Sequence, residues 1–255
     1  MSAADARSPR IDLNADVGEG CDDAALVPLV SSVNVSCGAH AGDDATSRAT
    51  IRIARAHDVA VGAHPSFPDR DGFGRRVTTR DPDAIADLVA AQVEHLAAIA
   101  SAEGATLAHV KPHGALYNLA AADRRVADAV ARGTARVLPG TRLLVLAGSL
   151  ALDAARDAGL VPVAEAFVDR EYLDDGTLAP RERAGAVVES LETATARAVA
   201  LALREPIASL DGRSLRIRAD TLCLHGDTPG AAARARAVRA ALDAAGIRVA
   251  PPGVT

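Results

Sequence analysis

A single lysine lies between two histidines near the middle of the chain. The chain contains 28 basic residues, and all of them except Lys111 are arginines. His109 and His113 lie two residues away on either side, so an extended backbone points the three side chains the same way. Pro112 favours that backbone at Lys111. An ammonium group is compact and can lose its proton when buried, whereas a guanidinium is wide and permanently charged. The pattern predicts that Lys111 either binds a carboxylate, phosphate or oxyanion as a small cation, or donates a proton with an adjustable pKa.

A second polar group comes from the first apolar segment of the chain. Asp12, Asn14 and Asp16 alternate with apolar residues, so in a strand they share one face. Three polar side chains on a buried face cost several kcal/mol unless they are paired or bind a ligand. The spacing therefore favours a functional role for the three residues as a set.

Other polar side chains gather where further strands are expected to end. They are Glu19, His40, His64, Arg75, Glu165, Asp169, Arg170, His225 and Asp227. The aromatic residues lie in the same segments, and they are Phe67, Phe73, Tyr117, Phe167 and Tyr172. Parallel α/β folds bind ligands at the carboxyl ends of their strands. We therefore expect one active site there, walled by aromatic rings, above a core of Ala, Val, Leu and Ile.

The elements that must position these residues alternate along the chain. Seven short aliphatic runs predict strands at 10–16, 32–37, 59–64, 107–111, 143–147, 160–165 and 221–225, with a possible edge strand at 247–250. Alanine-rich stretches predict helices at 46–57, 84–103, 120–137, 149–158 and 229–245. Such alternation favours parallel strands with helical crossovers, in a (β/α) barrel or an open doubly wound sheet.

The expected domain organisation is simple. Residues 10–255 read as one domain that follows a short flexible tail, 1–9. Residues 166–220 are too many for one loop and helix, so we expect an excursion there that covers the site. It contains a turn at 174–176, a helix near 184–203 and a tight turn at 209–212 between short strands.

Composition excludes several function classes. The formal net charge is −5, which argues against a nucleic-acid partner. The sequence has neither a P-loop nor a G-x-G-x-x-G loop for a nucleotide. No apolar run approaches the ~20 residues of a membrane span, and the first residues do not resemble a secretory signal. Three cysteines without a C-x-x-C pair suggest the reducing cytoplasm. Cys37 is an alternative candidate nucleophile.

Six ordered motifs resemble those of the LamB/YcsF family. They are IDLNADVGEG, SSVNVSCGAHAGD, VGAHPSFPDRDGFGRR, HVKPHGALYN, AFVDREYLDDGTLAPR and LCLHGDTPGA, and the match spans about residues 10 to 246. The resemblance implies a deformed seven-stranded (β/α) barrel, similar to polysaccharide deacetylases and some glycoside hydrolases. It also implies opening of 5-oxo-L-proline to L-glutamate, with ATP and magnesium as co-substrate and with two partner proteins, subunits B and C.

This activity assigns roles to the candidate residues. Asp16 or a neighbouring histidine, His40 or His64, is expected to activate water. Lys111, helped by His113, is expected to stabilise the oxyanion or phosphate. Arg170 or Arg75 is expected to bind the substrate carboxylate. The further expected substrate contacts are Asp12, Asn14, Glu19, Phe73, Tyr117, Asp169, His225 and Asp227.

The sequence leaves two alternatives. A tightly bound divalent metal is one, and Asp16, His40 and His64 would be its ligands. The other concerns which reaction the chain catalyses. The chain could be a metal-dependent deacetylase or amidohydrolase that acts alone without ATP, or a binding subunit that only presents substrate.

Overall fold

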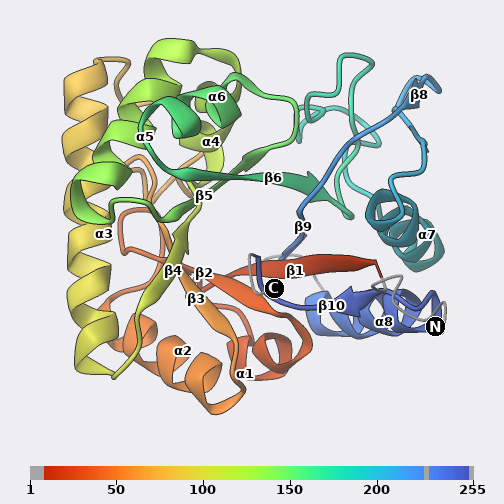
Figure 1. Cartoon of the computed structure of the whole chain (residues 1–255), viewed down its shortest axis with the longest axis horizontal. Coiled ribbons are helices and arrows are strands. Elements are labelled where there is room, and N and C mark those ends of the chain that lie inside the picture. The colour runs from red at the N-terminus through yellow and green to blue at the C-terminus, as the bar shows by residue number, and fades with distance from the viewer. Residues whose placement is uncertain (1–8, 227–229, 253–255) are drawn as a thin grey trace, which may run out of the picture.

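Seven parallel strands form a closed barrel. The computed structural model describes residues 9–226 and 230–252, and Figure 1 shows the arrangement. The barrel strands are β1 (Arg10–Val17), β2 (Ser32–Ser36), β3 (Ala60–His64), β4 (Leu107–Val110), β5 (Arg142–Leu146), β6 (Val161–Phe167) and β9 (Thr221–His225). Neighbours pair in parallel in this order, and β1 also pairs with β9, which closes the barrel. The barrel prediction is confirmed, and the open sheet is wrong. The edge strand is β10 (Arg248–Val249), which pairs with the start of β1.

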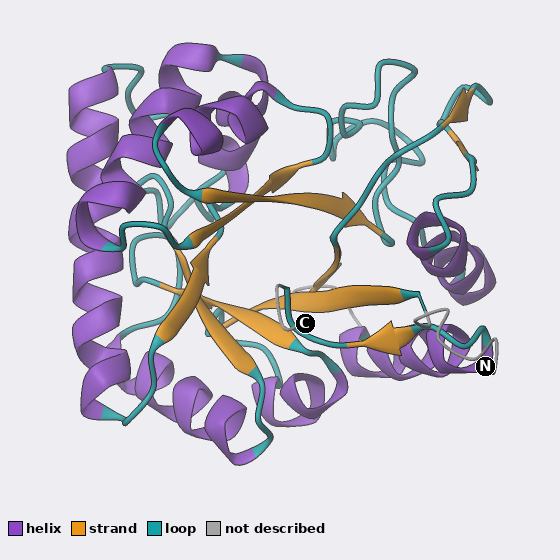
Figure 2. Ribbon diagram, viewed as in Figure 1, coloured by secondary structure: helices purple, strands orange, loops and turns teal. Residues whose placement is uncertain are grey.

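The helices lie outside the strands (Figure 2). They are α1 (Asp23–Leu26), the 3-10 helix η1 (Val27–Leu29), α2 (Asp44–Ala56), α3 (Pro82–Ala102), α4 (Gly114–Ala122), α5 (Arg124–Val137), α6 (Leu150–Asp157), α7 (Leu191–Ala202) and α8 (Ala231–Ala244). The single helix expected at 120–137 is wrong. The chain leaves the helical conformation at Asp123, whose carboxylate then accepts from the backbone NH of Arg125 and begins α5.

The excursion expected between the last two barrel strands is present. It contains α7 and a short antiparallel pair, β7 (Ile207–Ala208) and β8 (Ser214–Leu215), joined by the predicted tight turn. Isolated bridges join Arg170 to Val187 and Tyr172 to Leu178. These contacts fold residues 170–187 back on themselves beside the carboxyl ends of the strands.

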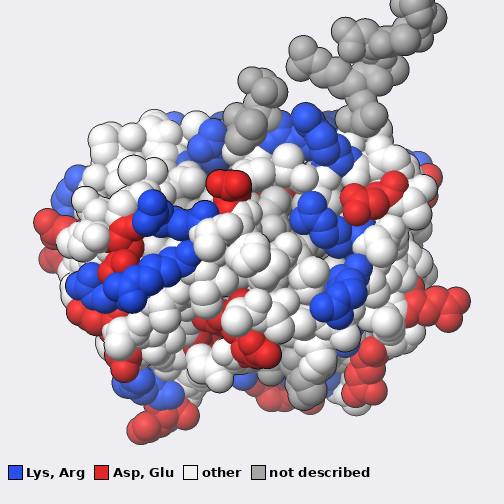
Figure 3. Space-filling model, turned by 90° about the horizontal axis from the view of Figure 1, so that it is seen from below, with Lys and Arg blue, Asp and Glu red and all other residues white. Residues whose placement is uncertain are grey.

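One helix within the described ranges, α3, is long and apolar enough to cross a membrane by length and composition alone. Its side chains Ile85, Val89, Val93 and Leu96 are buried and belong to the hydrophobic core. The packing of α3 in the barrel shell therefore accounts for its apolar character. On the face drawn in Figure 3, basic and acidic side chains are interspersed, with uncharged surface between them.

The inside of the barrel holds a polar network. The carboxylate of Asp12 accepts from the hydroxyls of Ser31, Ser32 and Thr221. The side-chain amide of Asn14 donates to Thr221 and, at 2.9 Å, to Oε1 of Glu165. These partners come from three different strands and one strand entrance. These hydrogen bonds within the protein satisfy the buried polar groups of the first strand, so no ligand is needed to offset the cost of burying them.

Asp12 gives the barrel a measurable pH dependence. Burial raises the pKa of Asp12 to about 6, from an ordinary 3.8, although its three hydroxyl partners oppose the rise. The folded chain therefore binds this proton more tightly than the unfolded chain, and stability falls as the pH rises through this window. Asp12→Asn does not titrate. From about pH 4 to pH 7, its free energy of unfolding should gain about 3 kcal/mol relative to that of the unchanged chain.

Urea unfolding at a series of pH values measures this difference. Asp87→Asn is the control, because Asp87 is exposed on α3 and forms a surface pair with Arg136. A difference between Asp12→Asn and the unchanged chain that stays constant with pH would show that the Asp12 pKa is ordinary.

Candidate active site at the carboxyl end of the barrel

A cavity of about 420 Å³ opens at the carboxyl ends of the strands. That volume suits a small-molecule site. Eleven of the residues predicted from the sequence line it, and they are Asp16, Glu19, His64, Phe73, Arg75, Lys111, His113, Tyr117, Phe167, Arg170 and His225. They come from the strands β1, β3, β6 and β9 and from the segments that follow β1, β3, β4 and β6.

The other predicted residues are placed differently. Asp12 and Asn14 face the barrel interior and are not among the residues that line the cavity. His40 and Asp169 lie behind the cavity wall, where each contacts a residue that lines it. Asp227 lies outside the described residues.

Lys111 is held at the floor of the cavity by two carboxylates. Its Nζ lies 2.9 Å from Oδ1 of Asp16 and 2.9 Å from Oε1 of Glu165. It also donates to Sγ of Cys223 at 3.0 Å. The ring of Phe167 lies beneath the ammonium, with its centroid 5.5 Å away. A lysine fits here better than an arginine, because its compact ammonium group can contact all of these groups within a buried space.

The surroundings keep Lys111 charged. Burial alone would lower its pKa, but Asp16, Cys223 and Glu165 outweigh burial and raise the pKa of Lys111 well above its usual range. Burial also opposes ionisation of Asp16, yet His64 and Lys111 hold the pKa of Asp16 well below its ordinary value. Of the two roles expected for Lys111, the geometry therefore favours a permanent cation over a proton donor.

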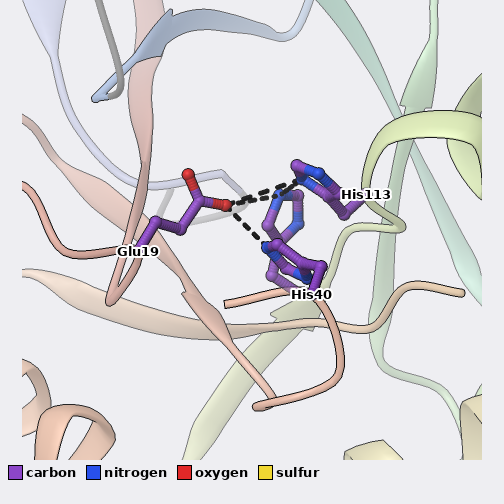
Figure 4. A group of neighbouring side chains, drawn as sticks. Glu19, His40 and His113 are labelled. Carbon is purple, nitrogen blue, oxygen red and sulfur yellow. Dashed lines mark hydrogen bonds and ion pairs between the residues drawn. The ribbon is translucent and has the colours of Figure 1, made fainter. Parts of the chain in front are cut away.

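Three imidazoles and a carboxylate meet at the cavity, and Figure 4 shows Glu19, His40 and His113 of this group pointing toward one another. Oε1 of Glu19 lies 2.8 Å from Nε2 of His40, 3.9 Å from Nε2 of His64 and 3.6 Å from Nδ1 of His113. The rings of His40 and His113 stack with centroids 3.8 Å apart. Burial lowers the pKa of His40 to about 3. We call these four residues the Glu–His cluster. They offer ligand atoms within 4.8 Å of one another, a spacing that suits a metal ion.

The loop after β3 holds this cluster in place. Asp69 accepts from the backbone NH groups of Gly72 and Arg76, which closes the loop on itself. Phe73 then adopts a left-handed backbone with φ 54°, uncommon for a bulky residue. Its carbonyl oxygen lies 2.9 Å from Nε2 of His113. A Cβ at the adjacent Gly74 would lie 2.8 Å from the His113 ring, so only glycine allows this approach.

His225 is positioned from behind by Asp169. The Asp169 carboxylate accepts from the backbone NH of His225 and lies 3.0 Å from its Nδ1. Although burial opposes it, the His225 contacts lower the pKa of Asp169 to about 2. The His225 ring stacks on Phe167, with centroids 5.4 Å apart. Asp169 therefore acts on the cavity through His225 and does not face it.

The prediction about the aromatic residues is right for three and wrong for two. Phe73, Tyr117 and Phe167 line the cavity. Phe67 and Tyr172 are fully buried in the hydrophobic core instead. The Tyr172 hydroxyl accepts from the backbone NH of Phe167 at 2.6 Å, which satisfies its polar end inside the core. The core is therefore not built from aliphatic residues alone.

Two residues that contact Lys111 have no role in the prediction: Glu165 is expected among the polar residues at the strand ends, and Cys223 is not. Glu165 is the only charged residue in the run VPVAEAF of β6, and a carboxylate in such a run is the signal that could have identified it. Cys223 has no comparable signal. The alternative nucleophile Cys37 is unfavourable, because burial raises the pKa of its thiol to about 12.

Comparison with known proteins agrees with the motifs. The model of the LamB/YcsF family matches residues 11–254. A protein of Heliobacterium modesticaldum, named as the A subunit of 5-oxoprolinase, is 52% identical over 247 residues, which cover 94% of this chain and 97% of the relative. A protein of the same name from Chloroflexus aggregans is 49% identical over 95% of this chain and 98% of the relative. The crystal structure of a lactam utilization protein from Thermus thermophilus superposes with a TM-score of 0.88, at 45% identity, over 94% of this chain and 99% of that one.

Proposed function

The chain belongs to the LamB/YcsF family, and we propose that it is the subunit of a 5-oxoprolinase that opens 5-oxo-L-proline to L-glutamate. Three relatives that carry the name of a 5-oxoprolinase subunit support a role in this enzyme. The reaction uses ATP, with magnesium, and releases ADP and phosphate. Two partner proteins, subunits B and C, complete the enzyme. Because the sequence has no standard phosphate-binding loop, the partners contribute to binding the nucleotide.

The observation that carries this proposal is the distribution of charge in the cavity. Carboxylates and imidazoles surround Lys111 at the floor, whereas Arg75, Arg170 and Arg181 line the same cavity elsewhere. A molecule with a carboxylate at one end and an amide at the other fits this arrangement. Its carboxylate binds the arginines, because the acidic floor repels it, and its lactam carbonyl then faces Lys111.

The chemistry needs a cation and a base at that floor. A five-membered lactam resists hydrolysis, and transfer of a phosphoryl group from ATP to its oxygen activates the ring carbon. Water then adds to this carbon and gives up a proton, the ring nitrogen takes a proton, and the C–N bond breaks. A second water hydrolyses the resulting acyl phosphate to glutamate and phosphate. Lys111 stabilises the charge on the oxygen of the tetrahedral intermediate.

Asp16 is the base that the geometry favours among the three expected candidates. It is ionised and lines the cavity, whereas His40 does not. Nε2 of His64 lies 3.5 Å from Oδ2 of Asp16, so both groups can contact one water molecule. A carboxylate with so low a pKa is a weak base for ordinary water, and the nucleophile needs further activation.

Reconstitution tests the proposed function. The chain is mixed with its candidate partners, ATP and 5-oxoproline, and glutamate and ADP are measured. We expect glutamate only when all components are present. Turnover of an N-acetylated substrate by the isolated chain, without ATP, would favour a stand-alone deacetylase or amidohydrolase. Wild-type rates with the Asp16→Asn variant, combined with weaker binding of oxoproline, would favour a subunit that only presents substrate.

Arg170 is the better placed of the two arginines expected to bind the substrate carboxylate. Its Nη2 donates to the carbonyl of Ala179, while its buried Nε has no hydrogen-bond partner among the described residues. Arg75 lies over the ring of Phe73, 5.0 Å from its centroid. In the reconstituted assay, Arg170→Met should raise KM for oxoproline by about tenfold to a hundredfold, with a smaller change in kcat. A larger rise with Arg75→Met would reverse the assignment.

A further inference from the structure

Two imidazoles of the Glu–His cluster are fixed in one tautomer by backbone carbonyls. Nδ1 of His64 lies 2.7 Å from the carbonyl oxygen of Lys111, and Nε2 of His113 lies 2.9 Å from that of Phe73. A carbonyl oxygen only accepts, so each of these nitrogens must carry the proton. In a neutral ring the other nitrogen then has none. Nε2 of His64 and Nδ1 of His113 therefore present lone pairs, and they lie only 3.0 Å apart.

A serine fixes the third ring in the same way. Nδ1 of His40 lies 2.8 Å from Oγ of Ser66, and this hydroxyl donates its one proton to the carbonyl of Phe67 at 3.0 Å. Oγ is thus an acceptor, and Nδ1 of His40 is the donor. Nε2 of His40 is left as a lone pair, 2.8 Å from the carboxylate oxygen Oε1 of Glu19.

With all three rings neutral, four lone pairs therefore converge with no proton between them. Three imidazole nitrogens and a carboxylate oxygen at 2.8–3.9 Å repel one another unless a positive charge lies among them. Excess protons are a poor source of that charge, because all three rings are buried and burial opposes the charged form of an imidazole.

We propose that Oε1 of Glu19, Nε2 of His40, Nε2 of His64 and Nδ1 of His113 bind one divalent transition-metal ion, such as zinc. Three imidazoles and one carboxylate are ligands that suit zinc. Each histidine donates its outer NH to an oxygen, which is the usual way that proteins orient metal-binding imidazoles. Glu19, His64 and His113 line the cavity, so the ion is reached from the substrate side.

This ligand set differs from the one expected from the sequence. His113 and Glu19 are included, and Asp16 is beside the site instead of in it, with its Oδ2 3.5 Å from Nε2 of His64. A zinc ion lowers the pKa of bound water to about 7. Asp16, a weak base for ordinary water, is thus placed where such activation is needed. The ion site itself does not depend on the proposed reaction.

Metal binding to the isolated chain tests the proposal without partners, ATP or oxoproline. After treatment with a chelator, the chain is titrated with zinc by calorimetry and with cobalt by visible absorption. We expect one ion per chain, and a cobalt spectrum typical of tetrahedral nitrogen and oxygen ligands. Glu19→Gln and His113→Ala should each weaken zinc binding by about 100-fold or more, and Ser66→Ala by about 10- to 100-fold.

His95→Ala is the matched control, since His95 is exposed on α3 and paired with Asp44 outside the site. Its zinc affinity should equal that of the unchanged chain. Circular dichroism spectra show that each variant is folded before titration. Failure of the unchanged chain to bind zinc or cobalt at micromolar concentrations would overturn the proposal, and so would unchanged affinity in Glu19→Gln. Loss of binding in His95→Ala alone would place the ion at the surface.

Discussion

Lys111→Ala is expected to lower glutamate formation in the reconstituted enzyme by about 100-fold or more, because the oxyanion loses its buried cation. The same change deprives the buried carboxylates of Asp16 and Glu165 of the ammonium that both contact. Loss of one partner from such a buried group costs about 3–5 kcal/mol of unfolding free energy. Both quantities are measurable, by the glutamate assay and by urea unfolding.

A second variant separates the two effects. Adding Glu165→Gln to Lys111→Ala removes one of the two carboxylates that lost the ammonium. The free energy of unfolding should therefore recover in part, while turnover stays low. Arg136→Ala is the control for loss of a basic residue, because Arg136 forms an exposed pair with Asp87. Near wild-type turnover in Lys111→Ala, with both partners present, would remove Lys111 from the mechanism.

Gly62→Ala is expected to destabilise the barrel by about 3 kcal/mol or more, the cost of overpacking a closed interior. A Cβ on Gly62 would lie 2.1 Å from Nε2 of His109. That nitrogen lies 2.7 Å from Oδ1 of Asn34, whose amide donates to Oδ1 of Asp16 at 2.8 Å. The added methyl group therefore displaces a ring that supports the active-site carboxylate. Thermal or urea unfolding measures the loss.

A double-mutant cycle shows whether the clash is the cause. His109→Ala removes the obstructing ring, at the cost of a cavity and a hydrogen bond. In that background, Gly62→Ala should cost much less than it does alone. If the free energy of unfolding of Gly62→Ala by itself stays within about 0.5 kcal/mol of that of the unchanged chain, Gly62 and His109 are not packed as closely as described.

The strands and most helices are predictable because their signals are local. Short aliphatic runs of β-branched residues gave all seven barrel strands, and Asp81 with Pro82 located the start of α3. The break between α4 and α5 was missed, since the alanine-rich sequence around Asp123 has high helix propensity on both sides. Barrel closure is predicted by the family resemblance and not by these local signals, because it depends on pairing between β1 and β9, at opposite ends of the chain.

The site was predictable in its membership but not in its contacts. Clustering at strand ends identified the residues that line the cavity, yet it did not show that Asp12 is satisfied by hydroxyls from other strands. The pairing of His113 with Glu19 and His40 depends on how the loop after β3 folds. Phe67 and Tyr172 were assigned to the cavity wall because sequence shows where a ring is attached but not where it points.

The polar barrel interior bears on how the chain folds. The bond from Thr221 to Asp12 joins residues 209 positions apart, and the contact of Lys111 with Cys223 spans 112. Contacts so distant in sequence slow folding, because the chain must close long loops before it gains from them. Until β9 docks on β1, Asp12 lacks the bond from Thr221 and Lys111 lacks the contact with Cys223. The pairing that closes the barrel therefore also completes the floor of the active site, and a nascent chain has no complete floor until almost its whole length has been synthesised.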